Sequence, residues 1–495
     1  MGKILEIRDL NFSFDRCSEN SLSNINLEIE EGELVFLTGP SGSGKSTLLN
    51  IIVGAIPEVI EGKLSGQLIL DGKENLKSYE RALIIGNVFQ NPRSQFFTTN
   101  TTAEMVFPLE NYGYSKEDME KILCELTRQH RLDALMDRDV FSLSSGERQK
   151  LALVSSLVLD PKLLIFDEPS ANLDYGNVMA LKKELIKLNG QGKSILVADH
   201  RCFYLMDIID KVLYMENGTL MELSPKEYME HLPKRQWRLL DEEKIQGNWN
   251  TPLKHVEVVR DELGEATKKD SLDKLGEPLL AANALSYPPI LKNISLSFYR
   301  KEIVIIVGVN GAGKTTLARV IAGCIKAKEG SLSREAEAFY VMQDAEFQLF
   351  AHSCDAELKI SSKDEKANLL SLKKLGLLKK INSHPQELSG GEKQRLQLAI
   401  ACTIDRDIII LDEPTSGLDI DSMDKLVALI QDLAENKAIV IISHDYEFIR
   451  KIGQRVIYMD EGKIKDDFYL IDDGIAKLNK IFKEMEALYE KSFED

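Results

Sequence analysis

Residues 39–47 are Gly39-Pro40-Ser41-Gly42-Ser43-Gly44-Lys45-Ser46-Thr47, and residues 308–316 are Gly308-Val309-Asn310-Gly311-Ala312-Gly313-Lys314-Thr315-Thr316. Both stretches fit the phosphate-loop pattern, in which a glycine and four variable residues precede Gly-Lys-Ser/Thr. The glycines let backbone N–H groups approach a polyphosphate, the lysine lies along its terminal phosphates, and the hydroxyl reaches Mg²⁺. Each stretch therefore predicts an ATP or GTP site, and the duplication predicts a chain built from two similar halves.

The residues around each loop predict the order strand, loop, helix. Short apolar runs typical of buried strands precede the loops at 33–38 and 302–307, and good helix formers follow each lysine. This order places phosphate at a helix N-terminus. Further upstream, alternating apolar and polar residues predict antiparallel strands. Phe14 and Tyr287 lie in these upstream segments. Each is a candidate for stacking on a purine ring, and the spacing leaves open the alternative of a half-buried strand residue.

The composition is typical of a globular protein, with 495 residues of which 43% are hydrophobic and 28% charged. The net charge of −17 argues against a general affinity for nucleic acid or for an anionic membrane surface. No apolar run approaches the roughly 18 residues needed to cross a bilayer, and the N-terminus resembles neither a signal peptide nor a myristoylation site. We therefore expect any membrane crossing to be done by another chain. The six cysteines are scattered without a Cys-x-x-Cys pair, which predicts reduced thiols.

A second repeated motif follows each loop. Residues 90–97 are Gln-Asn-Pro-Arg-Ser-Gln-Phe-Phe, and residues 343–350 are Gln-Asp-Ala-Glu-Phe-Gln-Leu-Phe. Each contains a glutamine, four variable residues, a second glutamine and a terminal phenylalanine. The first glutamine lies 45 positions after the loop lysine in the first half but only 29 positions after it in the second. The second half is therefore expected to lack part of an inserted subdomain.

A third repeat consists of Leu-Ser-Ser-Gly-Glu-Arg-Gln-Lys at 143–150 and Leu-Ser-Gly-Gly-Glu-Lys-Gln-Arg at 388–395. Serine and glycine before a run of helix formers predict a helix N-terminus that can bind an anion. A single copy would be interpreted as an ordinary helix cap. Two copies, each a short distance before an apolar strand that ends in Asp-Glu, favour a functional site. We call these two stretches the signature segments.

Two apolar strands end in Asp-Glu, at 167–168 and 412–413. Carboxylates at the C-terminal end of a buried parallel strand lie where an α/β sheet binds its ligand. Aspartate suits Mg²⁺, and the adjacent glutamate can polarise an attacking water. Burial is costly for such groups without a cation or hydrogen-bond donors, which disfavours a purely structural pair. The next strand in each half precedes a histidine, His200 or His444, whose shared place in the motif order predicts a contact with the γ-phosphate.

Charge and apolar spacing predict the domain boundaries. The segment rich in both charge signs, which contains Trp237 and Trp249, is interpreted as a linker. Apolar residues at helical spacing near the C-terminus predict an amphipathic helix that packs on its own domain. The predicted parts are a first domain at 1–223, a linker at 224–278, a second domain at 279–470 and the C-terminal helix at 471–495.

The phosphate loop, glutamine, Leu-Ser-x-Gly-Glu, Asp-Glu and histidine, twice and in this order, resemble the ATP-binding cassette (ABC) family. The resemblance implies an α/β fold with two P-loop cassettes, each with a mainly parallel sheet core, an antiparallel β subdomain and a helical signature subdomain. It also implies ATP hydrolysis with ATP and Mg²⁺ as cofactors. In that family two cassettes pair face to face, and each ATP lies between the loop of one and the signature segment of the other.

The resemblance also assigns roles to individual residues. The implied catalytic residues are Glu168, Glu413, His200, His444, Gln90 and Gln343. The implied magnesium ligands are Ser46, Gln90, Asp167, Thr315, Gln343 and Asp412. The implied ATP contacts are the two loops quoted above, the aromatic residues Phe14 and Tyr287, and the signature residues Ser144, Gly146, Glu147, Ser389, Gly391 and Glu392. Ser145 stands where the family usually has glycine, which adds a side chain near the phosphates of the site that contains Lys314. Whether this side chain slows that site is left open by the sequence.

Within the family, the motif at 90–97 resembles that of the cobalt-type and energy-coupling-factor importer ATPases, which are usually two separate chains. This chain is similar to a fusion of the two. The resemblance implies an integral membrane scaffold protein and a substrate-binding membrane protein as partners, uptake of a vitamin or transition-metal ion, and a peripheral location on the cytoplasmic face of the membrane. No nucleic-acid partner is expected. Two alternatives are a tandem sugar-importer ATPase and a soluble tandem-cassette translation factor that acts on ribosomes.

Overall fold

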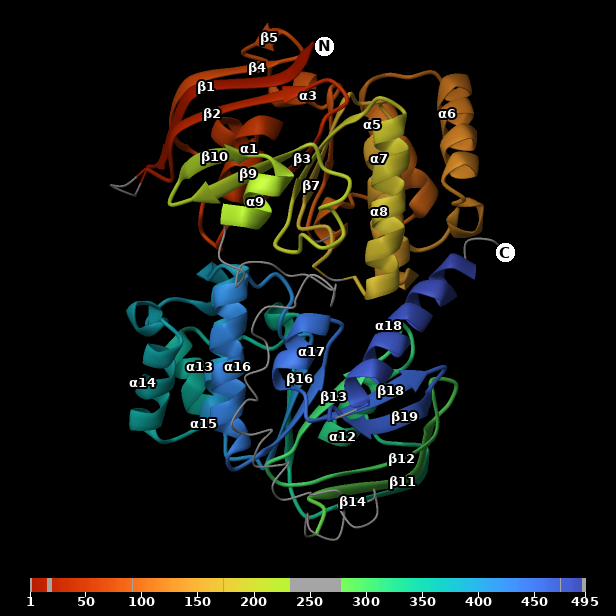
Figure 1. Cartoon of the computed structure of the whole chain (residues 1–495), viewed down its shortest axis with the longest axis vertical. Helices are drawn as coiled ribbons and strands as arrows, with labels where there is room; N and C mark the ends of the chain where they lie inside the picture. Colours follow the sequence, from red (N-terminus) through yellow and green to blue (C-terminus); the bar gives the residue numbers. More distant parts are fainter. Residues whose placement is uncertain are drawn as a thin grey trace. The chain divides into compact units, whose positions relative to one another are not determined.

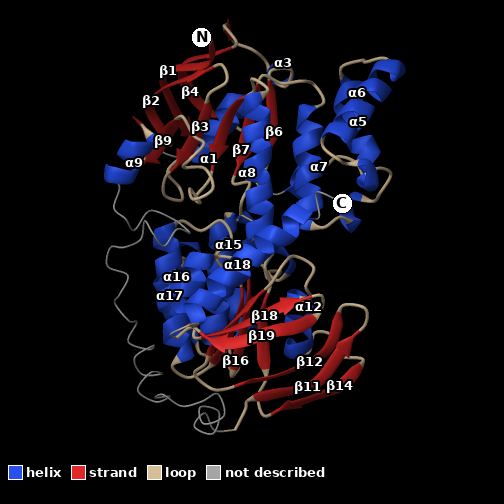
Figure 2. Cartoon of the chain, turned by 45° about the vertical axis from the view of Figure 1, so that its right-hand side comes forward, coloured by secondary structure: helices blue, strands red, loops and turns tan. Residues whose placement is uncertain are grey.

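A computed structural model describes residues 2–15, 20–90, 92–171, 173–231, 277–471 and 473–491. The chain forms two compact units, one built mainly from the residues before 240 and the other mainly from those after it. Each unit contains a mixed six-stranded sheet, a separate antiparallel sheet and a group of helices (Figures 1 and 2). Most of the predicted linker, including Trp237 and Trp249, lies outside the described residues.

The six-stranded sheet of the first unit has the order β10-β9-β3-β8-β7-β6. Its strands are β3 (Leu34–Thr38), β6 (Ile85–Val88), β7 (Leu163–Asp167), β8 (Ser194–Ala198), β9 (Lys211–Glu216) and β10 (Thr219–Leu223). All neighbours pair in parallel except β9 and β10, which are antiparallel. Residues of β3 and β8 are buried on both faces, as expected of a parallel sheet covered by helices.

The antiparallel sheet of the first unit has the order β2-β1-β4-β5. Its strands are β1 (Lys3–Phe14), β2 (Leu22–Glu30), β4 (Gly62–Leu70) and β5 (Lys73–Glu74). Between the two sheets lies one hydrophobic core, to which the helix after the first phosphate loop contributes. The helices of this region are α1 (Lys45–Val53), α2 (Ala55–Glu58) and α3 (Ser78–Arg81).

A separate hydrophobic cluster unites the helices between β6 and β7. They are α4 (Pro92–Gln95), α5 (Thr101–Asn111), α6 (Lys116–Gln129), the 3₁₀ turns η1 (Asp133–Leu135) and η2 (Val140–Ser142), and α7 (Ser145–Leu157). In Figure 1 α6 lies at the right edge of the first unit. This group is the helical signature subdomain that the sequence predicts. The helix α8 (Tyr175–Gly190) follows β7 and packs on the sheet.

The second unit repeats this architecture. Its six-stranded sheet has the order β15-β16-β17-β13-β18-β19, and its antiparallel sheet the order β12-β11-β14. The strands are β11 (Leu280–Tyr287), β12 (Leu291–Phe298), β13 (Ile303–Val307), β14 (Glu329–Arg334), β15 (Ala338–Val341), β16 (Ile408–Asp412), β17 (Ala438–Ile442), β18 (Arg455–Asp460) and β19 (Lys463–Tyr469). Only residues 335–337 separate β14 from β15, so this unit lacks the counterparts of β5 and α3. The predicted shortening is confirmed.

The helices of the second unit follow a similar order, except that the helix after β17 has only turns as its counterpart in the first unit. They are α12 (Lys314–Ala322), η5 (Ala345–Phe347), α13 (Cys354–Ser361), α14 (Glu365–Lys374), η6 (Leu378–Lys380), η7 (Pro385–Glu387), α15 (Gly390–Thr403), α16 (Ile420–Ala434), α17 (Tyr446–Ile452) and α18 (Gly474–Lys491). A cluster built around Leu358, Leu372 and Leu396 unites α13, α14 and α15 into the second helical subdomain. The α/β architecture with two P-loop cassettes, each with three parts, agrees with the prediction.

Two helices bear on the predicted domain boundaries. The helix α9 (Pro225–His231) falls inside the predicted linker, but its Tyr228 is 3% exposed, and the Tyr228 and Phe36 ring centroids are 6.3 Å apart. The core of the first unit thus extends beyond residue 223. The C-terminal helix α18 buries Leu478 and Met485, and the centroid of its Phe482 ring lies 5.3 Å from that of Tyr446 in α17.

No helix in the described part of the chain is both long enough and apolar enough to cross a bilayer.

Candidate ATP and magnesium sites

Each phosphate loop connects the central strand of its sheet to a helix that begins at the loop lysine. Gly39 has a φ of +145°, and a Cβ added there would lie 2.0 Å from the carbonyl oxygen of Met215. Gly308 repeats this arrangement, with a φ of +154° and 2.1 Å to the carbonyl oxygen of Met459. Only glycine fits these positions, because the next strand of the sheet passes directly against the loop backbone.

The loop lysines lie inside their loops. Lys45 Nζ donates hydrogen bonds to the carbonyl oxygens of Gly39 at 2.8 Å and Pro40 at 3.0 Å. Lys314 Nζ does the same to Gly308 at 2.7 Å and Val309 at 2.9 Å. Burial lowers the pKa of Lys45, although the charge of Glu168 opposes this shift. A buried ammonium at a helix N-terminus fits a polyphosphate ligand.

The other predicted loop residues lie around these lysines. Ser46, Thr47, Thr315 and Thr316 occupy the first turns of α1 and α12. The remaining positions form the turn before each helix: Ser41, Gly42, Ser43 and Gly44 in the first unit, and Asn310, Gly311, Ala312 and Gly313 in the second.

The predicted general bases lie just after β7 and β16 in a strained backbone conformation. Glu168 has a φ of +45° and Glu413 a φ of +48°, a region that residues other than glycine seldom adopt. Positive φ at such residues is concentrated at functional sites, where the surrounding structure enforces it. In both units the backbone N–H of the glutamate donates to a carbonyl of the neighbouring strand, Ala198 at 2.7 Å or Ile442 at 2.9 Å. The same unusual geometry therefore occurs twice.

The predicted histidines contact these glutamates. Nε2 of His200 lies 3.4 Å from Oε1 of Glu168, and Nε2 of His444 lies 3.2 Å from Oε1 of Glu413. In the first unit Gln90 Nε2 also donates to Glu168 Oε2 at 2.6 Å. Each unit thus brings together a predicted base and a predicted γ-phosphate contact, which lie far apart in the sequence.

The carboxylates predicted to bind Mg²⁺ end the strands before these glutamates. Burial and the charge of Glu168 raise the pKa of Asp167 to about 6. Burial also raises the pKa of Asp412, against the effect of the hydrogen bonds that it accepts. Thr315 Oγ1 donates one of these bonds to Asp412 Oδ2 at 3.0 Å. A hydroxyl beside a carboxylate is the oxygen donor set that Mg²⁺ prefers, so these residues fit that cation.

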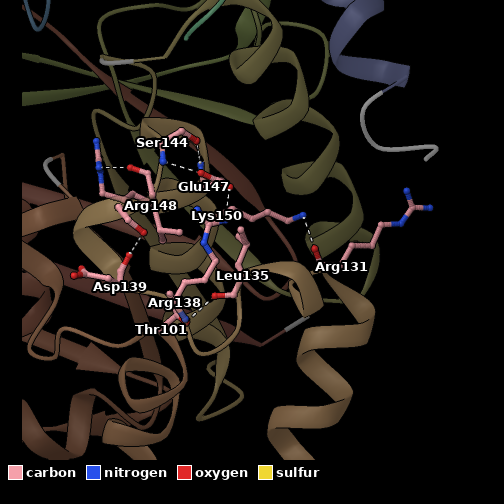
Figure 3. Close-up of polar contacts among 11 residues, drawn as sticks. Thr101, Arg131, Leu135, Arg138, Asp139, Ser144, Glu147, Arg148 and Lys150 are labelled. Carbon is pink, nitrogen blue, oxygen red and sulfur yellow. Dashed lines mark hydrogen bonds and ion pairs between the residues drawn. The ribbon is translucent and has the colours of Figure 1, made fainter. Parts of the chain in front are cut away.

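The signature segments begin α7 and α15 with the same capping arrangement. Ser144 N donates to Glu147 Oε2 at 2.7 Å, and Glu147 N donates to Ser144 Oγ at 3.3 Å (Figure 3). In the second unit Ser389 and Glu392 form the same reciprocal pair, with distances of 2.9 and 3.4 Å. These capping boxes stabilise the helix starts. The helix cap, which is the alternative to an anion site, is thus present in both copies.

Further contacts hold the first signature segment in place. Arg138 Nη1 lies 3.1 Å from Glu147 Oε1, and the backbone N–H of Arg138 donates to the hydroxyl of Thr101 at 3.1 Å (Figure 3). The guanidinium of Arg148 donates to the carbonyl of Leu143. The signature glutamate is therefore tied to α5 as well as to its own helix.

Comparison with known protein families identifies the chain. A family model described as ABC transporter matches residues 22–171 and 291–416. The chain belongs to this family. A relative from Treponema denticola, provisionally named an ABC transporter ATP-binding protein, is 37% identical over 93% of this chain and 96% of its own length. A second protein of that organism with the same name is 34% identical over 97% of this chain and 100% of its own. This ABC protein is an ATPase that uses ATP and Mg²⁺.

Solved structures support the tandem ABC fold. The archaeal ABCE1 of a ribosome-bound complex with Pelota matches 96% of this chain and 80% of its own, with a TM-score of 0.68 and 19% identity. An RNase-L inhibitor matches 95% of this chain and 92% of its own, with a TM-score of 0.60 and 20% identity. At these identities the likeness concerns the fold alone.

The roles of three predicted ABC site residues stay predictions: ATP stacking for Phe14 and Tyr287, and magnesium binding for Gln343. Phe14 is half-buried, and its ring packs edge to face on Phe12 at 4.9 Å. Tyr287 is also half-buried, with Lys328 Nζ 5.4 Å from its ring centroid. Tyr287 pairs with Leu291 in the second cassette, and Phe12 pairs with Leu22 at the matching register in the first. The residue that matches Tyr287 is therefore Phe12, and Phe14 lies two residues further along β1. Gln343 is exposed just after β15.

Sequence analysis missed several residues around these ABC sites. The Tyr340 hydroxyl donates to Asp412 Oδ2 at 2.6 Å, and no sequence pattern had singled it out. Glu104 and Glu357 are each 4% exposed. Each accepts a hydrogen bond from the backbone N–H of the residue just after the second motif, Thr98 or Ala351. Both glutamates lie 14 residues after the first motif glutamine, and this equal spacing is a signal that could have found them.

Proposed function

We propose that this ATPase powers an importer of the energy-coupling-factor type, at the cytoplasmic face of the membrane. Its partners would be an integral membrane scaffold protein and a substrate-binding membrane protein, and its cargo a vitamin or a transition-metal ion. The observation that carries the proposal is the paired Gln-aromatic segment, which presents exposed phenylalanines on a fixed backbone in both cassettes. The relatives from Treponema denticola carry a transporter name, which supports it.

The second glutamine of each motif ties the segment to the helix of the signature segment. Gln95 Oε1 accepts from Phe89 N at 3.1 Å, and its Nε2 donates to the Ala152 carbonyl in α7 at 2.9 Å. Gln348 Oε1 accepts from Met342 N at 3.0 Å and from Gln397 Nε2 in α15 at 2.8 Å. In both cassettes the residue before the first motif glutamine is thus linked to the signature helix.

A buried glutamate fixes the other end of the segment. Glu104 Oε2 accepts from the backbone N–H groups of Phe97 at 3.0 Å and Thr98 at 2.8 Å. Glu357 Oε2 accepts from Phe350 at 3.0 Å and from Ala351 at 2.6 Å. Hydrogen bonds to a buried carboxylate are stronger than neutral ones, so they hold the chain in one conformation.

The fixed backbone presents two phenylalanine rings to solvent. Phe97 is 78% exposed and stacks on Phe107 with a centroid distance of 5.1 Å, and Phe350 is 75% exposed. Exposed aromatic rings on a rigid support are typical of the surfaces that bind partner proteins. Because Gln90 contacts Glu168 and Gln95 contacts α7, a partner docked on Phe97 would be sensitive to changes at the ATP site.

The residues of each site then have defined tasks. The loop lysine and the backbone N–H groups at the helix N-terminus bind the phosphates, and the hydroxyl and aspartate hold the cation. Mg²⁺ neutralises phosphate charge when it is bound. Glu168 and Glu413 accept a proton from the attacking water, and His200 and His444 orient the glutamate and the terminal phosphate. The use of each signature segment by the other cassette's ATP site stays a prediction.

Purification of the tagged full-length chain from gently solubilised native membranes tests the proposal. We expect small multi-spanning membrane proteins to co-purify, as identified by mass spectrometry. The double variant Phe97→Ser/Phe350→Ser should lose them, whereas Tyr79→Ser, which changes another exposed aromatic ring, should retain them. Co-purification of ribosomal proteins without membrane proteins would reject the importer and favour the translation-factor alternative.

A further inference from the structure

The magnesium-site aspartates of the two cassettes have different neighbours. In the second cassette Asp412 is 4% exposed, and its Oδ2 accepts hydrogen bonds from Tyr340 at 2.6 Å and from Thr315 at 3.0 Å. Tyr340 is itself only 6% exposed and lies on β15, the strand next to β16. Two donors on one oxygen fix the carboxylate and leave Oδ1 for another ligand.

The strand register identifies the matching position in the first cassette. Tyr340 pairs with Ile410, two residues before Asp412, and Asn87 pairs with Ile165, two residues before Asp167. Asparagine therefore takes the place of the tyrosine. Among the described residues, no hydrogen bond joins Asp167 to Asn87 or to Ser46, and Asp167 is more exposed than Asp412.

A positive charge accompanies the tyrosine. Arg319 lies on α12 five positions after Lys314, and its charge favours the ionised forms of both Tyr340 and Asp412. The residue five positions after Lys45 is Asn50. The second cassette thus has arginine and tyrosine where the first has two asparagines.

We propose that Tyr340 is a positioning residue that holds Asp412 for the divalent cation of the second ATP site, and that the first site binds its cation without such support. Partners that orient a metal ligand fix its geometry before the metal arrives, and their loss typically costs 10–100-fold in metal affinity. The inference depends on ATP and Mg²⁺ binding by each cassette and is independent of the proposed transport.

The test measures Mn²⁺ binding to the full-length chain in the presence of a non-hydrolysable ATP analogue, by the electron paramagnetic resonance signal of free Mn²⁺. The Lys45→Ala parent restricts nucleotide binding to the second site, and the Lys314→Ala parent restricts it to the first. Adding Tyr340→Phe to the first parent should weaken Mn²⁺ binding about tenfold. Adding the same change to the Lys314→Ala parent should leave Mn²⁺ binding unaltered.

Tyr340→Asn, which introduces the residue of the first cassette, is a second variant and should give the same selective loss. A purely structural role for Tyr340 would lower the thermal unfolding temperature without changing Mn²⁺ affinity. The proposal is overturned if neither variant weakens Mn²⁺ binding at the second site. Equal weakening at both sites would also overturn it, because the effect would then be general damage to the fold.

Discussion

The residue before the predicted γ-phosphate histidine, His200 or His444, differs between the two cassettes. In the first it is Asp199, a buried carboxylate that accepts from the Tyr204 hydroxyl at 2.8 Å and from the backbone N–H groups of Ser170 and Arg201. In the second it is Ser443, whose hydroxyl accepts from Asp445 N at 3.1 Å. Two sites with the same motif residues are thus supported by different neighbours, which predicts that they differ in stability and rate.

A similar difference occurs where the strand before each phosphate loop begins, at the end away from the loop. Arg455 in the second cassette donates to both carboxylate oxygens of Asp467, at 2.6 and 2.7 Å, and to buried Glu302 at 3.1 Å. The matching residue of the first cassette is Lys211, which lies 3.1 Å from Glu33 and 3.3 Å from Glu222. The match follows from the register, because Arg455 pairs with Val304 and Lys211 with Val35. Arginine makes a two-pronged contact that lysine cannot.

The largest expected effect compares the two general bases. Glu168→Gln and Glu413→Gln should each slow hydrolysis by about 10²–10⁴-fold at its own site, because the base is lost. Steady-state ATPase rates of the two single variants and the double variant measure this. If Ser145 slows the site that contains Lys314, then Glu413→Gln should cost the smaller share of total turnover. Unchanged rates in both single variants would contradict the assignment of these glutamates.

The next effect concerns the buried charge network. Arg455→Met leaves Glu302 buried without its cation and should destabilise the second cassette by about 3–5 kcal/mol. The matched variant Lys211→Met should cost the first cassette no more than about 1 kcal/mol. Hydrogen–deuterium exchange of peptides from β18 and β19, and from β9 and β10, measures each cassette separately. Equal loss of protection in the two cassettes would remove this distinction.

The smallest effect concerns the hydroxyl of Tyr204. Tyr204 and Phe448 are both fully buried and lie four residues after their histidines. Tyr204→Phe removes a hydrogen bond to Asp199 and should cost about 1.5 kcal/mol, as judged by exchange in β8. Phe448→Tyr should also destabilise its cassette, since it buries a hydroxyl opposite a serine instead of a carboxylate. A Tyr204→Phe variant as stable as the parent would show that the bond to Asp199 contributes nothing.

The sequence by itself determined the duplicated α/β fold and most of the motif positions. Glycine spacing, apolar strand runs and terminal carboxylates are local patterns, and local geometry requires them. The strand predicted before each histidine is present in the structure, as β8 (Ser194–Ala198) and β17 (Ala438–Ile442). The equal spacing of Glu104 and Glu357 after the first motif glutamine is also a property of the sequence.

Only the tertiary structure decided which side chains meet. Tyr340 contacts Asp412 because two parallel strands pair in one register, and no local pattern determines the register between segments 72 residues apart. The same holds for Glu168 with Gln90 and His200, and for Tyr228 of α9 against Phe36. Motifs identify the chemistry of each cassette because they are local. The differences between the cassettes depend on neighbours that only folding brings together.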